Sequence, residues 1–114
     1  MDASKENDSI LYLVALKPEP GYEEQFNRWY EEEHIPELLE CPGFNSARRY
    51  RAVEGDPQYI AIYEIESMDA FKSTEYQRLA ARELDDLTPL AREVVSHRQR
   101  EILAKYRLIS EHEK

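Results

Sequence analysis

The sequence has very little cysteine, fewer basic than acidic residues, and no long hydrophobic run. Its one cysteine, Cys41, cannot form a disulfide within the chain and has no second thiol with which to bind a structural metal ion. The longest apolar run, residues 10–16, is far shorter than the roughly 20 residues of a membrane-spanning helix. The sequence therefore argues against membrane insertion, structural zinc and a disulfide-stapled fold.

Basic residues are in the minority: 15 Lys and Arg stand against 24 Asp and Glu, for a formal net charge of −9. Such a field repels the phosphate backbone of nucleic acids and anionic membrane surfaces, so we expect neither as a partner. The first residues also lack the basic and apolar regions of a secretory signal peptide, which predicts a cytoplasmic protein.

The chain does contain enough apolar material for one domain, because 41% of its 114 residues are hydrophobic and eight are tyrosine. We expect a flexible tail over residues 1–9, a single domain over residues 10–109 and a C-terminal tail over residues 110–114. A domain of this size has a modest core, and a second copy of the chain would enlarge it.

Hydrophobic periodicity predicts alternating strands and helices within that domain. Pro36 is expected to break or kink the first helix beyond His34, leaving a short turn, and Pro89 is expected to divide the second helical stretch. The predicted strands cover residues 10–16, 44–53, 59–65 and 102–109, and the predicted helices cover residues 22–34 and 68–95.

This βαββαβ order is that of the α+β, ferredoxin-like fold, a four-stranded antiparallel sheet with both helices on one face. The first strand, residues 10–16, is apolar on both of its faces, and only one of them can meet the helices. We therefore predict that a second sheet from an identical subunit covers the other face, which makes the protein a homodimer.

His34 lies four residues after Tyr30 and eight after Phe26, on the apolar stripe of the first helix. An imidazole with an ordinary pKa near 6.5 suits general acid/base chemistry at neutral pH, and a position near a helix C-terminus favours its protonated form. The pattern alone favours the alternative, in which His34 caps the broken turn before Pro36.

The second and third predicted strands supply the other candidate residues. Alternation along the second strand places Arg48 and Tyr50 on one face, where they could stabilise an enolate or phenolate; surface pairing with carboxylates is the alternative for the arginine. Ala61 and Tyr63 share a face of the third strand beside Tyr12, which suggests a tyrosine-rich lining for a ligand or simply a packed aromatic cluster. The histidines do not have the paired spacing of a metal site.

Residues 26–44 (FNRWYEEEHIPELLECPGF) resemble the EthD-like family of the dimeric α/β-barrel superfamily. They contain the aromatic pair Trp29-Tyr30, His34 one turn later, and a Pro-Gly turn leading into the second strand. The resemblance implies two ferredoxin-like subunits packed sheet against sheet, each with a pocket between helices and sheet. It also implies a small-molecule enzyme and favours the acid/base role of His34 over the structural one.

The resulting hypothesis is a cofactor-independent enzyme of the lyase, dehydratase or isomerase type. Its substrate would be a small hydrophobic aromatic, polyketide-like or lactone compound, and we expect neither a cofactor nor a metal ion. The alternatives are a cofactor-free monooxygenase of the same fold, or a non-catalytic module that binds a small molecule, or haem with His34 as axial ligand. The predicted catalytic residues are His34, Tyr30 and Arg48, and the predicted substrate-binding residues are Tyr12, Phe26, Trp29, Tyr50, Ala61 and Tyr63.

Overall fold

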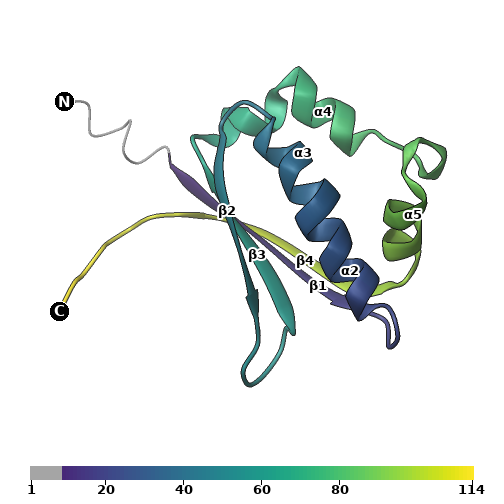
Figure 1. The fold of residues 1–114 in the computed structure, drawn as a ribbon. Coiled ribbons are helices and arrows are strands. Elements are labelled where there is room, and N and C mark those ends of the chain that lie inside the picture. The colour runs from purple at the N-terminus through teal and green to yellow at the C-terminus, as the bar shows by residue number, and fades with distance from the viewer. Residues whose placement is uncertain (1–8) are drawn as a thin grey trace.

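The apolar run near the start of the chain forms strand β1 (Ile10–Pro18), which lies inside a four-stranded antiparallel sheet of order β2-β3-β1-β4 (Figure 1). The other strands are β2 (Phe44–Arg51), β3 (Tyr59–Ile65) and β4 (Arg98–Arg107). The computed structural model describes residues 9–114, with Arg100 described by its backbone alone. Residues 1–8 of the predicted N-terminal tail lie outside the described residues.

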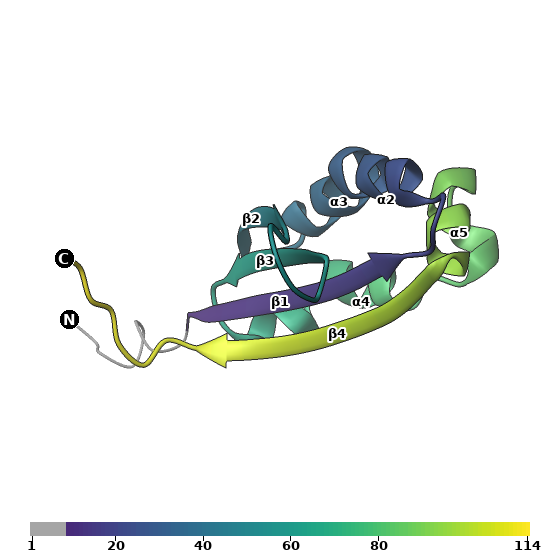
Figure 2. The same ribbon diagram turned by 90° about the horizontal axis from the view of Figure 1, so that it is seen from below.

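Helical segments fill the two long connections of the sheet, and Figure 2 shows α2 and α3 on one side of β1 and β4. The predicted α+β, ferredoxin-like βαββαβ fold is therefore confirmed. Among residues 9–114, no helix is both long and apolar enough to cross a membrane. The segments are α2 (Glu23–Trp29), η1 (Tyr30–His34) and α3 (Ile35–Leu39), then η2 (Met68–Lys72), α4 (Thr74–Ala80), η3 (Leu84–Asp86) and α5 (Pro89–Ser96).

The first helix does not break before Pro36. Its middle turn, η1, is a π-helical turn in which the Ile35 N–H donates to the Tyr30 carbonyl five residues earlier, and α3 continues directly from it. Pro36 lies at the start of α3, directly after this wider turn. The wider turn absorbs the proline, so the helix runs on to Leu39 where a short separate turn was predicted.

Strand β2 contains an irregularity that the alternation rule missed. Its pairing register with β3 shifts between Phe44 and Ser46, so one extra residue is inserted near the start of the strand. From there on, Arg49 lies opposite Ala61 on the helix-covered face, whereas Arg48 and Tyr50 lie opposite Ile62 and Ile60 on the other face. Strict alternation along the second strand would also put Phe44 on the face of Arg48 and Tyr50, and that prediction is wrong.

The second helical connection and the last strand also differ from the predicted bounds. The stretch 68–95 forms four short segments rather than two helices, with Pro89 opening α5 and the Ser67 hydroxyl capping η2. Strand β4 begins at Arg98, four residues earlier than predicted, and its register with β1 shifts between Lys17 and Pro18. This earlier start brings charged side chains of β4 into the sheet beside the helices.

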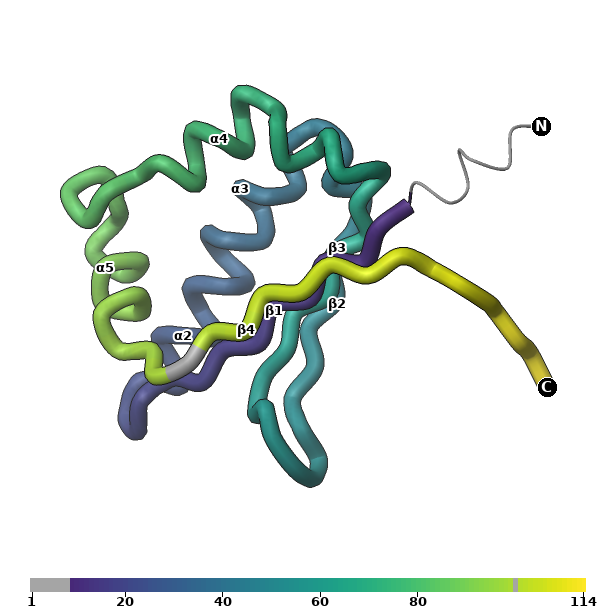
Figure 3. Tube along the Cα trace, turned by 180° about the vertical axis from the view of Figure 1, so that it is seen from behind, coloured from purple at the N-terminus to yellow at the C-terminus, as the bar shows by residue number. Residues whose placement is uncertain are grey.

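The core lies between the helices and one face of the sheet, where Phe26, Tyr63, Ile65 and Val94 are almost completely buried. The opposite sheet face is largely apolar, and no helix of residues 9–114 covers it. Tyr106 and Leu11 on that face are 54% and 45% exposed. Figure 3 shows β1 and β4 running side by side, with the β2–β3 hairpin extending beyond them.

Candidate functional site

A cavity of about 360 Å³ lies between the helix-covered face of the sheet and the helices. Strands β1 and β4 form its floor, and the first helix, α4 and the segment after α4 form its walls. Aromatic and aliphatic side chains dominate the lining. The lining residues are Tyr12, Val14, Leu16, Trp29, Tyr30, His34, Leu38, Tyr76, Leu79, Ala80, Arg82, Arg98, Glu101 and Leu103.

The π-helical turn places His34 at the wall of this cavity. Its ring stacks on Trp29, with centroids 4.3 Å apart and planes 17° apart, and meets the edge of Tyr30 at 5.2 Å. In a regular α-helix, residues five apart point about 140° away from each other. The wider π turn brings Trp29 and His34 onto one face, and this pairing gives the imidazole a fixed orientation.

The electrostatic setting of His34 keeps its imidazole neutral. Loss of water around the ring, with a smaller effect of the positive charges of Arg82 and Arg98, lowers the pKa of His34 to about 4. The prediction that the helix C-terminus would favour the protonated form is wrong, because the helix runs on to Leu39 and His34 lies within it, where desolvation lowers the pKa. At neutral pH the ring can therefore accept a proton or a hydrogen bond from a ligand.

Tyr30 reaches the same cavity from a more deeply buried position. Its ring is only 2% exposed and packs edge-on against Phe26 at 5.1 Å, and the guanidinium of Arg49 lies 4.6 Å from its centroid. Burial raises the pKa of the Tyr30 phenol, as it does for Tyr12. Both phenols therefore stay protonated at neutral pH and can donate a hydrogen bond to a ligand oxygen.

Four of the nine predicted site residues line the cavity: His34, Tyr30, Tyr12 and Trp29. Phe26 and Ala61 lie behind Tyr30 in the core, and Tyr63 is fully buried with no hydrogen-bond partner for its hydroxyl. The remaining two, Arg48 and Tyr50, lie on the far face of the sheet because of the register shift in β2.

Arg49, which was not predicted as a site residue, lies beside Tyr30 on the helix-covered face. It donates to the Glu31 carboxylate at 2.9 Å and to the Asn27 side-chain oxygen at 2.6 Å, and its side chain is only 15% exposed. These contacts hold the guanidinium against the aromatic core from outside the cavity. Arg49 is thus suited to position Tyr30 rather than to contact a ligand there.

Three charged residues of the cavity were not predicted from the sequence: Arg82, Arg98 and Glu101. Arg82 follows α4 and pairs with Glu37 at 2.6 Å, and Arg98 pairs with Glu101 at 3.5 Å at the start of β4. A strand predicted to begin at residue 102 could not bring Arg98 or Glu101 to the cavity. The only sequence feature that could have pointed to Arg98 and Glu101 was the basic and polar stretch directly before that predicted strand.

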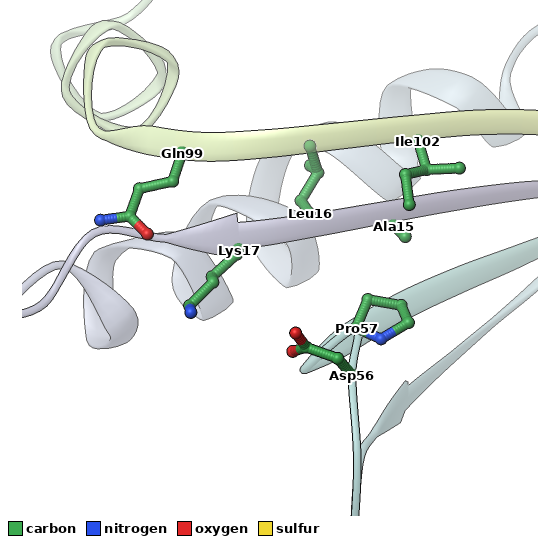
Figure 4. Close-up of a pocket in the computed structure, with 7 residues that line it drawn as sticks. All are labelled: Ala15, Leu16, Lys17, Asp56, Pro57, Gln99 and Ile102. Atoms are coloured by element: carbon green, nitrogen blue, oxygen red, sulfur yellow. The ribbon is translucent and has the colours of Figure 1, made fainter.

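A second hollow of about 290 Å³ lies on the opposite sheet face, next to the β2–β3 loop (Figure 4). Lys17 from β1 and Asp56-Pro57 from the loop face it, together with Gln99 and Ile102 from β4. Among the described residues, its lining includes no imidazole, thiol or tyrosine. The helix-side cavity is therefore the better candidate for chemistry.

The described part of the chain offers little support for a cysteine nucleophile or for a metal site. Cys41 is buried, its thiol contacts the Glu37 carbonyl at 3.6 Å, and burial raises the pKa of that thiol. Among residues 9–114, no cluster of three or more His, Cys, Asp or Glu side chains has the geometry to hold a metal ion. The potential chemistry of the described residues centres on His34.

Comparison with known proteins supports the fold. A family model described as a domain of unknown function, DUF4286, matches residues 9–106. No curated protein is similar enough in sequence to count as a match.

Several solved structures share the architecture. The cofactor-independent oxygenase SnoaB from Streptomyces nogalater has a TM-score of 0.58 at 16% identity, over 90% of this chain and 93% of that one. The heme-degrader MhuD from Mycobacterium tuberculosis gives 0.60 at 16%, over 91% and 99%. An EthD family protein from Bacillus halodurans gives 0.57 at 15%, over 88% and 99%, which confirms the resemblance at the level of the fold.

Proposed function

Since the chain belongs to the DUF4286 family, a membership that by itself assigns no activity, we propose from its cavity that it is a cofactor-independent enzyme acting on a small aromatic compound. The observation that carries the proposal is the neutral imidazole of His34, held by Trp29 and Tyr30 at the wall of a cavity that also presents tyrosine hydroxyls. A positioned, unprotonated base beside protonated phenols provides the groups needed to move a proton on an enolisable or phenolic substrate.

The proposed reaction begins when His34 takes a proton from an acidic C–H or O–H bond of the substrate. The electron pair of that bond moves onto the substrate oxygen as an enolate or phenolate, which a phenol hydrogen bond from Tyr30 stabilises. The imidazolium then returns the proton. Return to another carbon gives an isomerase; transfer to a departing hydroxide gives a dehydratase and releases water.

The pH dependence of turnover tests this role of His34. Only the neutral imidazole can accept the proton, so kcat/KM should fall as the pH drops through the pKa of His34, about 4. An ordinary histidine would produce the same loss near pH 6.5. A screen of phenolic and lactone compounds by thermal shift supplies the substrate, and its pH–rate profile supplies the measurement. A loss of kcat/KM centred near pH 6.5 would contradict the proposal that a desolvated His34 is the base.

The second candidate is a cofactor-free monooxygenase, which the printed description of SnoaB as a cofactor-independent oxygenase favours. The same deprotonation by His34 would then yield a carbanion that reduces dioxygen, with one oxygen atom entering the substrate and the other leaving as water. Oxygen uptake under turnover separates the two enzymes, because the lyase or isomerase consumes none. If the purified protein shows no Soret band of bound haem after haem is added, the non-catalytic haem-binding alternative is excluded.

We further propose that two copies of the chain associate through the uncovered sheet face. Leu13 lies there between Ile62 and Ala104, and the neighbouring Ile102 is 38% exposed in a single copy. A contiguous apolar face of this kind favours burial against a like surface. Sedimentation should show a dimer that Ile102→Glu converts to monomer. Leu84→Glu, at an exposed leucine on η3, should leave the dimer intact; a monomeric parent protein would contradict the proposal.

A further inference from the structure

The helix-side cavity contains more positive charge than the protein as a whole would suggest. Two arginines, Arg82 and Arg98, and one carboxylate, Glu101, are its fully charged lining residues. The whole chain, by contrast, has a formal net charge of −9. The arginines come from different elements, one after α4 and the other at the start of β4, and the fold brings both to the same cavity as His34.

Neither guanidinium is saturated by the partners it has. Arg82 Nη1 lies 2.6 Å from Glu37 Oε2, and Arg98 Nη2 lies 3.5 Å from Glu101 Oε2, a longer and weaker contact. Each planar guanidinium has several further N–H donors and can bind a carboxylate through two of them at once. The two side chains are 32% and 29% exposed, so a ligand in the cavity can reach the remaining donors.

The electric field of both arginines also reaches His34 at the wall of the cavity. Arg82 and Arg98 are the charged groups that contribute to lowering the pKa of His34. A negative charge bound near them would lie close to the imidazole as well. The remaining lining, which includes Trp29, Tyr76 and Leu103, offers flat aromatic and aliphatic surface but no further full charge.

We infer that the cavity takes ligands with a flat aromatic body and one carboxylate, with the carboxylate held by Arg82 and Arg98 and the ring against Trp29 and Tyr76. This inference rests on the proposed function in assuming that this cavity is the substrate site, and it names the substrate class of that site. The arginines would act by binding and orienting the acid, which leaves the proton transfer to His34. A neutral aromatic compound of the same shape would lack the charge-assisted contacts.

The test compares the binding of 2-naphthoate and 2-naphthamide, two probes of nearly the same shape that differ in charge, by isothermal titration calorimetry. We expect the acid to bind at least about tenfold more tightly than the amide. Arg82→Gln and Arg98→Gln should each weaken acid binding about five- to tenfold and leave amide binding unchanged. Arg92→Gln, at an exposed arginine on α5 outside the cavity lining, is the matched control and should change neither.

A variant that is expected to raise the affinity for 2-naphthoate keeps the test informative if an arginine variant folds poorly. Glu37→Gln removes the carboxylate that now occupies Arg82, so 2-naphthoate should bind more tightly, by about threefold or more. Equal affinity for acid and amide, no measurable binding of the acid, or weaker acid binding by Glu37→Gln would each overturn the inference. If His34 variants lose turnover while acid and amide bind alike, the enzyme proposal stands and only the substrate class fails.

Discussion

Replacing His34 with alanine is expected to lower kcat by about 10²- to 10⁴-fold, the usual contribution of a positioned general base. The reason is geometric as well as chemical. The ring stacks on Trp29 at 4.3 Å and meets Tyr30 edge-on at 5.2 Å, so the proposed proton acceptor has a fixed orientation in the cavity. Steady-state kinetics on the substrate found by screening gives the measurement, and KM should change much less than kcat because the arginines and aromatic rings remain.

A matched control uses the other histidine that the fold orders by stacking. His97 lies parallel to Tyr22 with ring centroids 3.8 Å apart, and its Nδ1 is 3.1 Å from a Glu19 carboxylate oxygen. It does not line the cavity. His97→Ala therefore removes comparable stacking without touching the site, and kcat should stay within about twofold of the parent value. Full turnover by His34→Ala, with the fold intact by circular dichroism, would show that His34 is structural.

The fold was predictable because its signals are local and periodic. The run at residues 10–16 is apolar on both faces and does form a central strand, and the hairpin of β2 and β3 follows from alternation and its turn residues. These patterns determine strand order and the helix-covered face once the βαββαβ sequence is recognised. The π turn at Tyr30–His34 and the register shift after Phe44 have no comparable signature, because each depends on how the rest of the chain packs.

The register shift explains why Arg48 and Tyr50 were wrongly expected at the site. A one-residue shift in a strand exchanges its two faces, and it is why Arg49 rather than Arg48 lies beneath Tyr30. The arginines of the cavity were missed for a different reason. Arg82 and Arg98 reach the same cavity only through tertiary structure, one from the segment after α4 and one from an early start of β4. The first helix, by contrast, carried Trp29, Tyr30 and His34 together in sequence, so that part of the site was predicted.

The second large effect concerns stability, and Gly43→Ala is expected to lower the free energy of unfolding by about 2–4 kcal/mol. Gly43 has a φ of +88°, which strains any side chain, and an added Cβ would lie 2.7 Å from the Cβ of Ala70 on η2. Its carbonyl also accepts a hydrogen bond from the Glu66 N–H at 2.8 Å, so the turn cannot move without breaking that contact. Urea denaturation followed by circular dichroism measures the change.

Gly21→Ala separates backbone strain from steric overlap. Gly21 has nearly the same φ, +90°, but no atom lies within 4 Å of the position its Cβ would take. Gly21→Ala should therefore lower the free energy of unfolding by only about 1–2 kcal/mol, the cost of backbone strain. Because Gly43 leads directly into Phe44, whose ring stacks on the cavity residue Tyr76 at 5.5 Å, only Gly43→Ala should also weaken ligand binding in the cavity. Equal losses of stability in the two variants would show that contact with Ala70 is unimportant and that this turn is free to shift.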